Sequence, residues 1–128
     1  MRKNIALGAI LLAGAMLTGL AGCSREAPVS YARDVQPILQ ANCLRCHQTG
    51  GPGFEASGFS MMTYDDLMKG TKFGPMIVPG DSAASNLLVL MEGRADPSIS
   101  MPHDRAEPVA KADIDKIRLW IDQGAKKN

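Results

Sequence analysis

The chain has 128 residues, and its 14 Lys and Arg nearly balance its 13 Asp and Glu, giving a formal net charge of +1. This balance gives no indication of a nucleic-acid partner, and it predicts weak long-range electrostatic steering. The length suits one domain. The three cysteines, two histidines and eight methionines are the residues most able to bind a metal or a cofactor.

The N-terminus has the layout of a secretory signal peptide. Arg2 and Lys3 form a basic start, and residues 5–20 are almost entirely apolar or small. The stretch ends in Leu20-Ala21-Gly22-Cys23, which resembles the bacterial lipobox, where cleavage precedes a cysteine that becomes lipidated. We therefore expect a lipoprotein signal peptide over 1–22 and a lipid on Cys23.

An uncleaved transmembrane anchor is the alternative for this segment. About sixteen apolar residues are short for a membrane span, and a membrane helix gives no reason for Cys23. The sequence thus predicts an exported protein, lipid-anchored at the periplasmic side of a bacterial membrane, and Ser24 favours the outer membrane. Residues 23–29 form the lipidated N-terminus and a short linker, and 30–128 form the single folded domain.

The strongest motif is Cys43-Leu44-Arg45-Cys46-His47, the Cys-x-x-Cys-His signature of c-type haem attachment. It follows a helix predicted over 34–42 from the spacing of its apolar residues. Two thiols on one helical turn can each bond to a vinyl group on the same porphyrin edge, and the next histidine then becomes an axial iron ligand. The motif therefore predicts one covalently bound haem c held by Cys43, Cys46 and His47.

Two other uses of these cysteines are open to the sequence. A disulfide between Cys43 and Cys46 suits an exported protein, but it leaves His47 without a role. Zinc would need Cys43, Cys46, His47 and His103, and the adjacent Cys46 and His47 fit one tetrahedral ion poorly. Haem explains more of the motif than either.

The rest of the chain predicts an all-α protein of about four short helices and no strands. Residues 48–58 are rich in glycine and predict a loop, with a carbonyl there or near Phe59 accepting the proton on His47 Nδ1. Three further helices are predicted: 64–69 capped by Thr63, 82–92 capped by Asp81, and 113–123 with an apolar stripe.

The second axial ligand has several candidates. Met101 precedes Pro102 in an irregular stretch, Met76 lies in a loop, and His103 is the second histidine of the chain. A thioether ligand gives six-coordinate iron and raises its potential. Spacing alone favours Met101 and leaves Met76 and His103 open.

These motifs together resemble the small class I-type c cytochromes, in particular a bacterial group of exported single-haem domains. The similarity covers about residues 30–125 and rests on residues 35–39, 43–47, 64–70, 78–81, 101–102 and 117–125. It implies that Met101 is the distal ligand and that the first and last helices cross. The chain departs from that group at His103-Asp104-Arg105, where proline and glycine often follow Met-Pro.

The resemblance implies electron transfer rather than catalysis. We expect a membrane-tethered mono-haem c-type cytochrome that passes single electrons between periplasmic or membrane redox partners. A peroxidase-like or gas- or redox-sensing haem domain with an open or displaceable sixth ligand is the alternative. A third possibility is an accessory domain whose haem is only structural.

Overall fold

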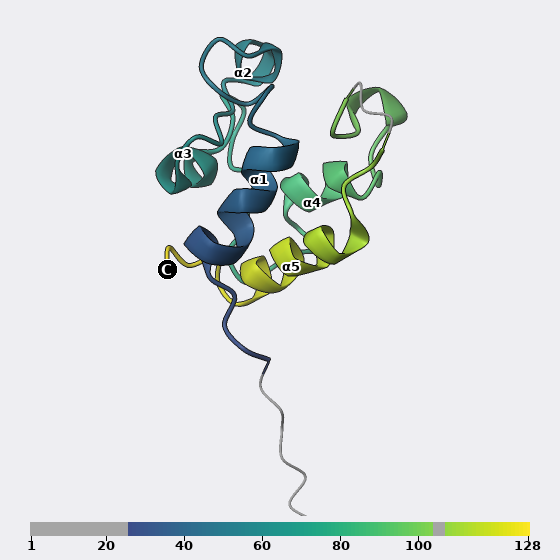
Figure 1. Cartoon of the computed structure of the whole chain (residues 1–128). Helices are drawn as coiled ribbons and strands as arrows, with labels where there is room; N and C mark the ends of the chain where they lie inside the picture. Colours follow the sequence, from purple (N-terminus) through teal and green to yellow (C-terminus); the bar gives the residue numbers. More distant parts are fainter. Residues whose placement is uncertain (1–25, 104–106) are drawn as a thin grey trace, which may run out of the picture.

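The computed structural model describes residues 26–103 and 107–128, so the predicted signal peptide 1–22 and the predicted lipidation site Cys23 lie outside the described residues. Over the described part the chain is helical, with a single isolated bridge between Thr71 and Gly74 and no strand, which confirms the all-α prediction. The elements are η1 (Tyr31–Val35), α1 (Gln36–Asn42), α2 (Pro52–Ser57), α3 (Tyr64–Lys69), α4 (Asn86–Met91), η2 (Pro97–Ile99) and α5 (Lys111–Asp122). Figure 1 shows α2 at one end of the molecule and α5 towards the other.

The first helix begins earlier than predicted, because Ser30 caps it. The Ser30 hydroxyl accepts from the Arg33 N–H at 3.2 Å, and the Ser30 N–H donates to Asp34 Oδ2 at 2.8 Å. These reciprocal bonds satisfy donors that a helix start otherwise leaves open. Helical structure therefore runs from Tyr31, first as the π-helix η1 and then as α1.

The prediction of a loop over 48–58 is wrong, because residues 52–57 form α2. Pro52 occupies the first turn, where its missing N–H costs nothing, and Gly58 ends the helix in the left-handed conformation with φ of 71°. The Phe54 N–H donates to the Cys46 carbonyl at 3.0 Å and ties the new helix to the Cys-x-x-Cys-His turn. The prediction missed this helix because the several glycines in the stretch favour a loop, although a proline at the start and a glycine at the end are also typical of a short helix.

The two middle helices differ in how well the sequence predicted them. α3 is confirmed with its cap, since the Asp66 N–H donates to the Thr63 hydroxyl at 3.1 Å. α4 is shorter than predicted and begins at Asn86 rather than 82, with Ser85 at its N-cap. Asp81 caps only a turn, where its carboxylate accepts from the Ala84 N–H at 2.9 Å.

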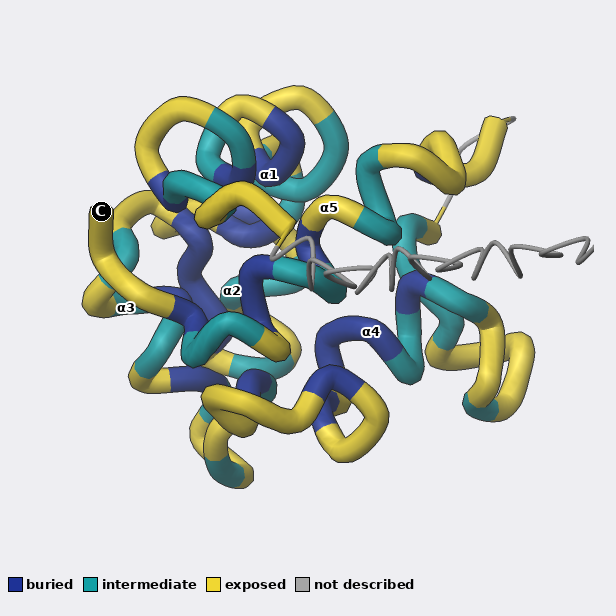
Figure 2. Tube along the Cα trace, turned by 90° about the horizontal axis from the view of Figure 1, so that it is seen from below, coloured by how far each residue is buried: buried dark blue, intermediate teal, exposed yellow. Residues whose placement is uncertain are grey.

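The core lies between α5 and the first helix. Ile117, Trp120 and Ile121 on α5 are at most 1% exposed, and they join Val35, Ile38 and Leu39 in one buried cluster, as the predicted crossing requires. The contact of α5 is chiefly with η1, where the rings of Tyr31 and Trp120 lie 5.6 Å apart. The buried stretches of α1, α4 and α5 are visible in Figure 2.

The end of the described chain is bonded to its beginning. The Val29 N–H donates to Gln123 Oε1 at 2.8 Å, and the Tyr31 N–H donates to Asn128 Oδ1 at 2.9 Å. In Figure 1 this junction lies at the opposite end of the molecule from α2. Among the described residues, no helix has the length and apolar character needed to cross a membrane.

Candidate functional site

A cavity of about 1050 Å³ lies among the Cys-x-x-Cys-His turn, α2, α4 and the segment before α5. Its volume is at the upper end of the range of roughly 300–1,000 Å³ found for ligand pockets. Most of its wall is apolar. The lining includes Asn42, Cys43, Cys46, His47, Gly53, Phe59, Met61, Phe73, Met76, Leu87, Leu90, Met91, Ile99, Met101, His103 and Val109.

The Cys-x-x-Cys-His segment forms a tight turn directly after α1. The Cys43 N–H donates to the Leu39 carbonyl, and the N–H groups of Cys46 and His47 both donate to the Cys43 carbonyl, at 3.1 and 3.0 Å. This turn places both cysteines, each partly buried, on the same cavity wall. Both lie within the described residues, and no disulfide joins them.

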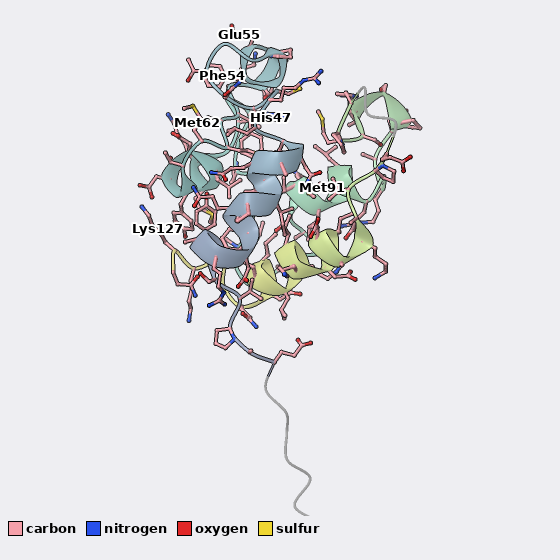
Figure 3. All side chains as sticks on the ribbon, in the orientation of Figure 1. His47, Phe54, Glu55, Met62, Met91 and Lys127 are labelled. Atoms are coloured by element: carbon pink, nitrogen blue, oxygen red, sulfur yellow. The ribbon has the colours of Figure 1, made fainter. Side chains whose placement is uncertain are left out.

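His47 is buried and held in one tautomer. Its Nδ1 lies 3.1 Å from the Phe59 carbonyl oxygen, which can only accept, so Nδ1 carries the hydrogen and Nε2 keeps its lone pair. This confirms the predicted acceptor near Phe59. Burial lowers the pKa of His47 below its ordinary value; the Phe59 carbonyl opposes this shift, and the nearby His103 adds to it. Figure 3 labels His47 where α1 meets the region of α2.

Every candidate proposed for the second axial position lines the same cavity. Met101, Met76 and His103 are all there, so the fold brings the candidates together without choosing among them. The Met101 N–H donates to the Leu90 carbonyl at 3.1 Å, which fastens the Met-Pro segment to α4. Met62 is 49% exposed and accepts from the Thr49 hydroxyl, away from the cavity.

The zinc alternative gains no support from the geometry. Within residues 26–103 and 107–128, no three side chains of His, Cys, Asp or Glu come close enough together to hold a metal ion. Cys43, Cys46, His47 and His103 all belong to this described part. They share the cavity wall, but they do not converge on one point.

Residues 43–104 match the model of a family described as Planctomycete cytochrome C, a c-type cytochrome family. The matched stretch contains both the Cys-x-x-Cys-His turn and Met101. This chain is cytochrome c-like. Such a family implies haem c as the cofactor and a redox role for it.

A curated relative and a solved structure add to this match. The chain is 24% identical over 127 positions to hydrazine synthase subunit alpha of Kuenenia stuttgartiensis, covering 80% of this chain and 16% of the relative. A chain of the solved Kuenenia stuttgartiensis hydrazine synthase aligns with a TM-score of 0.50 and 22% identity, over 76% of this chain and 16% of that one. The cytochrome c-like chain thus spans a small part of these proteins, and the structural likeness shows the fold alone.

The residues around the cavity fit haem c. Two thiols three positions apart, an imidazole with Nε2 available and a thioether are the donor types that this cofactor uses. The sequence did not predict which other residues line the cavity. Leu87 and Leu90 on α4, Ile99, Val109 and the exposed Phe73 carry no local signal, because only the folded chain brings them to the Cys-x-x-Cys-His turn.

Proposed function

We propose that this protein is a membrane-tethered mono-haem c-type cytochrome that transfers single electrons between redox partners. The observation that carries the proposal is that Cys43, Cys46, His47 and Met101 line one cavity, although 54 positions separate His47 from Met101. Haem c supplies a one-electron iron couple when it is bound. The proposal includes no nucleic-acid partner.

Each residue has a defined task in this proposal. Cys43 and Cys46 would hold the haem covalently through thioether bonds, and His47 would present Nε2 to the iron while the Phe59 carbonyl keeps Nδ1 protonated. Met101 would supply the second, thioether ligand from a segment fastened to α4. The apolar side chains of Leu87, Leu90 and Val109 line the cavity and would shield a bound haem from water, and a dry site with a thioether ligand favours a high reduction potential.

The tether rests on the lipobox. With a lipid on Cys23, the linker to Val29 reaches at most about 20 Å, so the domain would stay close to the bilayer. Bacterial lipoproteins carry more than one acyl chain on this cysteine, and stable anchoring requires that. The partners would then be periplasmic redox proteins or the exposed parts of membrane redox proteins, and the outer membrane remains the favoured site.

The distal ligand is tested with single substitutions in the haem-loaded protein. Met101→Ala should remove the weak far-red sulfur-to-iron absorption band, lower the reduction potential and open the iron to carbon monoxide or cyanide. His103→Ala and the control Met62→Ala, at an exposed position outside the cavity, should leave the band in place. A band that persists in Met101→Ala would move the ligand to Met76 or another methionine.

A second candidate is a haem site that binds small molecules, as in a peroxidase-like or sensing domain. The observation that favours it is that His103 and Met101 line the same cavity, and that the relative above is named as an enzyme subunit. The two candidates differ in the wild-type protein. A six-coordinate, low-spin ferrous spectrum that carbon monoxide does not change favours electron transfer, and rapid binding of carbon monoxide favours the second candidate.

A further inference from the structure

The start of α2 packs unusually close to His47. A Cβ atom built on Gly53 would lie 2.7 Å from Cε1, 2.9 Å from Nε2 and 3.0 Å from Nδ1 of the imidazole. A Cβ on Gly51 would lie 2.5 Å from the Cys46 carbonyl oxygen. Distances below 3.0 Å are far shorter than carbon contacts allow. The backbone of α2 can therefore reach the ring and the preceding turn only where side chains are missing.

The backbone conformation does not explain the glycine at position 53. Its φ lies outside the left-handed range, in contrast to Gly50 and Gly58 at 79° and 71°. Gly53 belongs to α2, and alanine is favoured over glycine inside a helix. The feature that requires glycine here is the imidazole itself.

Two other contacts hold the same ring. The Phe59 carbonyl accepts from Nδ1, and the Phe59 ring packs against the imidazole in a T-shaped arrangement, with a centroid distance of 5.4 Å and an interplanar angle of 65°. The hydrogen bond fixes one point of the ring, but rotation about that bond would still change the plane of the imidazole. A rigid backbone against Cε1 and Nε2 removes this freedom, and the bond from the Phe54 N–H to the Cys46 carbonyl fixes α2 in place.

We propose that Gly53 is a positioning residue that sets the plane of the His47 imidazole by bringing the α2 backbone against the ring. The inference rests on the proposed role of His47 as an axial ligand. A methyl group at position 53 would displace or rotate the ring, because the backbone of α2 is tied to the haem-binding turn. The orientation of the ligand plane controls the unpaired-electron distribution on ferric low-spin haem, so the change is visible by spectroscopy.

The test compares Gly53→Ala with Glu55→Ala, an exposed position on the same helix, in the haem-loaded protein. We expect Gly53→Ala to reorder the haem-methyl resonances in the proton NMR spectrum of the ferric form and to shift its electron paramagnetic resonance g values. Glu55→Ala should reproduce the wild-type spectra. Wild-type spectra in Gly53→Ala, with resistance to urea equal or higher, would overturn the proposal, since that is the result for an ordinary helical glycine.

A second pair of variants covers the case in which Gly53→Ala accumulates too little haem protein. Phe59→Leu keeps the carbonyl acceptor and gives the imidazole room to shift. A displaced ligand signature in Gly53→Ala/Phe59→Leu relative to Phe59→Leu supports the proposal, and identical signatures overturn it. Failure of the proposed function is recognised separately, because the wild-type spectrum would then lack a histidine-ligated haem.

Discussion

Among the described residues, Trp120 is the largest fully buried side chain, and it lies in the crossing of α5 with η1. It is 1% exposed, its ring lies 5.6 Å from that of Tyr31 and 6.4 Å from that of Tyr64, and its indole N–H donates to the Lys126 carbonyl at 2.9 Å. Trp120→Phe keeps an aromatic ring but removes the donor. Trp120→Ala removes both.

The two substitutions should differ by a predictable amount. Loss of one hydrogen bond costs about 0.5–1.5 kcal/mol, and the smaller ring adds a little lost burial, so Trp120→Phe should lower the free energy of unfolding by about 1–2 kcal/mol. Trp120→Ala should lower it by about 3–5 kcal/mol, as for other buried tryptophans. Against a total of about 5–15 kcal/mol for a small domain, the alanine variant would lose a large share of its stability.

The measurement is urea unfolding of the haem-loaded protein, followed by far-ultraviolet circular dichroism. Fluorescence is unsuitable, because Trp120 is the single tryptophan of the chain. Met62→Ala is the control at a half-exposed position and should change stability by less than about 0.5 kcal/mol. Equal losses in Trp120→Phe and Trp120→Ala, or a loss below about 1 kcal/mol in the alanine variant, would refute the reasoning that the packed Trp120 ring stabilises this crossing.

Three further predictions concern the haem, the loop before α4 and the anchor. Cys43→Ala/Cys46→Ala should abolish covalent haem and leave a chain that is degraded or unfolded, seen on a denaturing gel stained for haem; a stable haem-free fold would contradict the haem assignment. Ser85→Ala should lower the free energy of unfolding by about 1–3 kcal/mol, because the buried Ser85 hydroxyl accepts from the Val78 N–H at 2.9 Å; urea titration measures it, and an unchanged midpoint would count against it. Cys23→Ala should release haem-loaded protein from the membrane fraction, and a wild-type protein already soluble after lysis would rule out the lipobox.

Local features of the sequence predicted the parts of the fold that depend on neighbouring residues. The helix 64–69 has its stated bounds, because the Thr63 cap and the following Gly70 act within one turn. The acceptor for His47 near Phe59 was predicted correctly, because a ligand histidine needs such a partner and few carbonyls lie within reach. The ligand set itself stays a prediction from the motif.

Contacts between distant residues decided the features that the sequence left open or predicted wrongly. The segment after Asp81 does not become helical until Asn86. The Ser85 hydroxyl, not an N–H, donates to the Asp81 carbonyl at 2.8 Å, and the Ser82 N–H donates to Asp122 Oδ1 on α5 at 2.9 Å, across 40 positions. No local pattern encodes such a bond. The bond to Asp122 exists only because α5 folds back alongside, and it ties the segment before α4 to α5.

The residues of the cavity also divide into those that the sequence predicted and those that only the fold brought together. The sequence by itself determined that two thiols and a histidine share one turn, because five consecutive residues carry that information. Only the tertiary structure decided that Met76, Met101 and His103 reach the same space as His47, and that the α2 backbone lies against the imidazole at Gly53. Both features depend on how side chains from separate segments pack together. The residue order within one segment does not show how well it will fit against another.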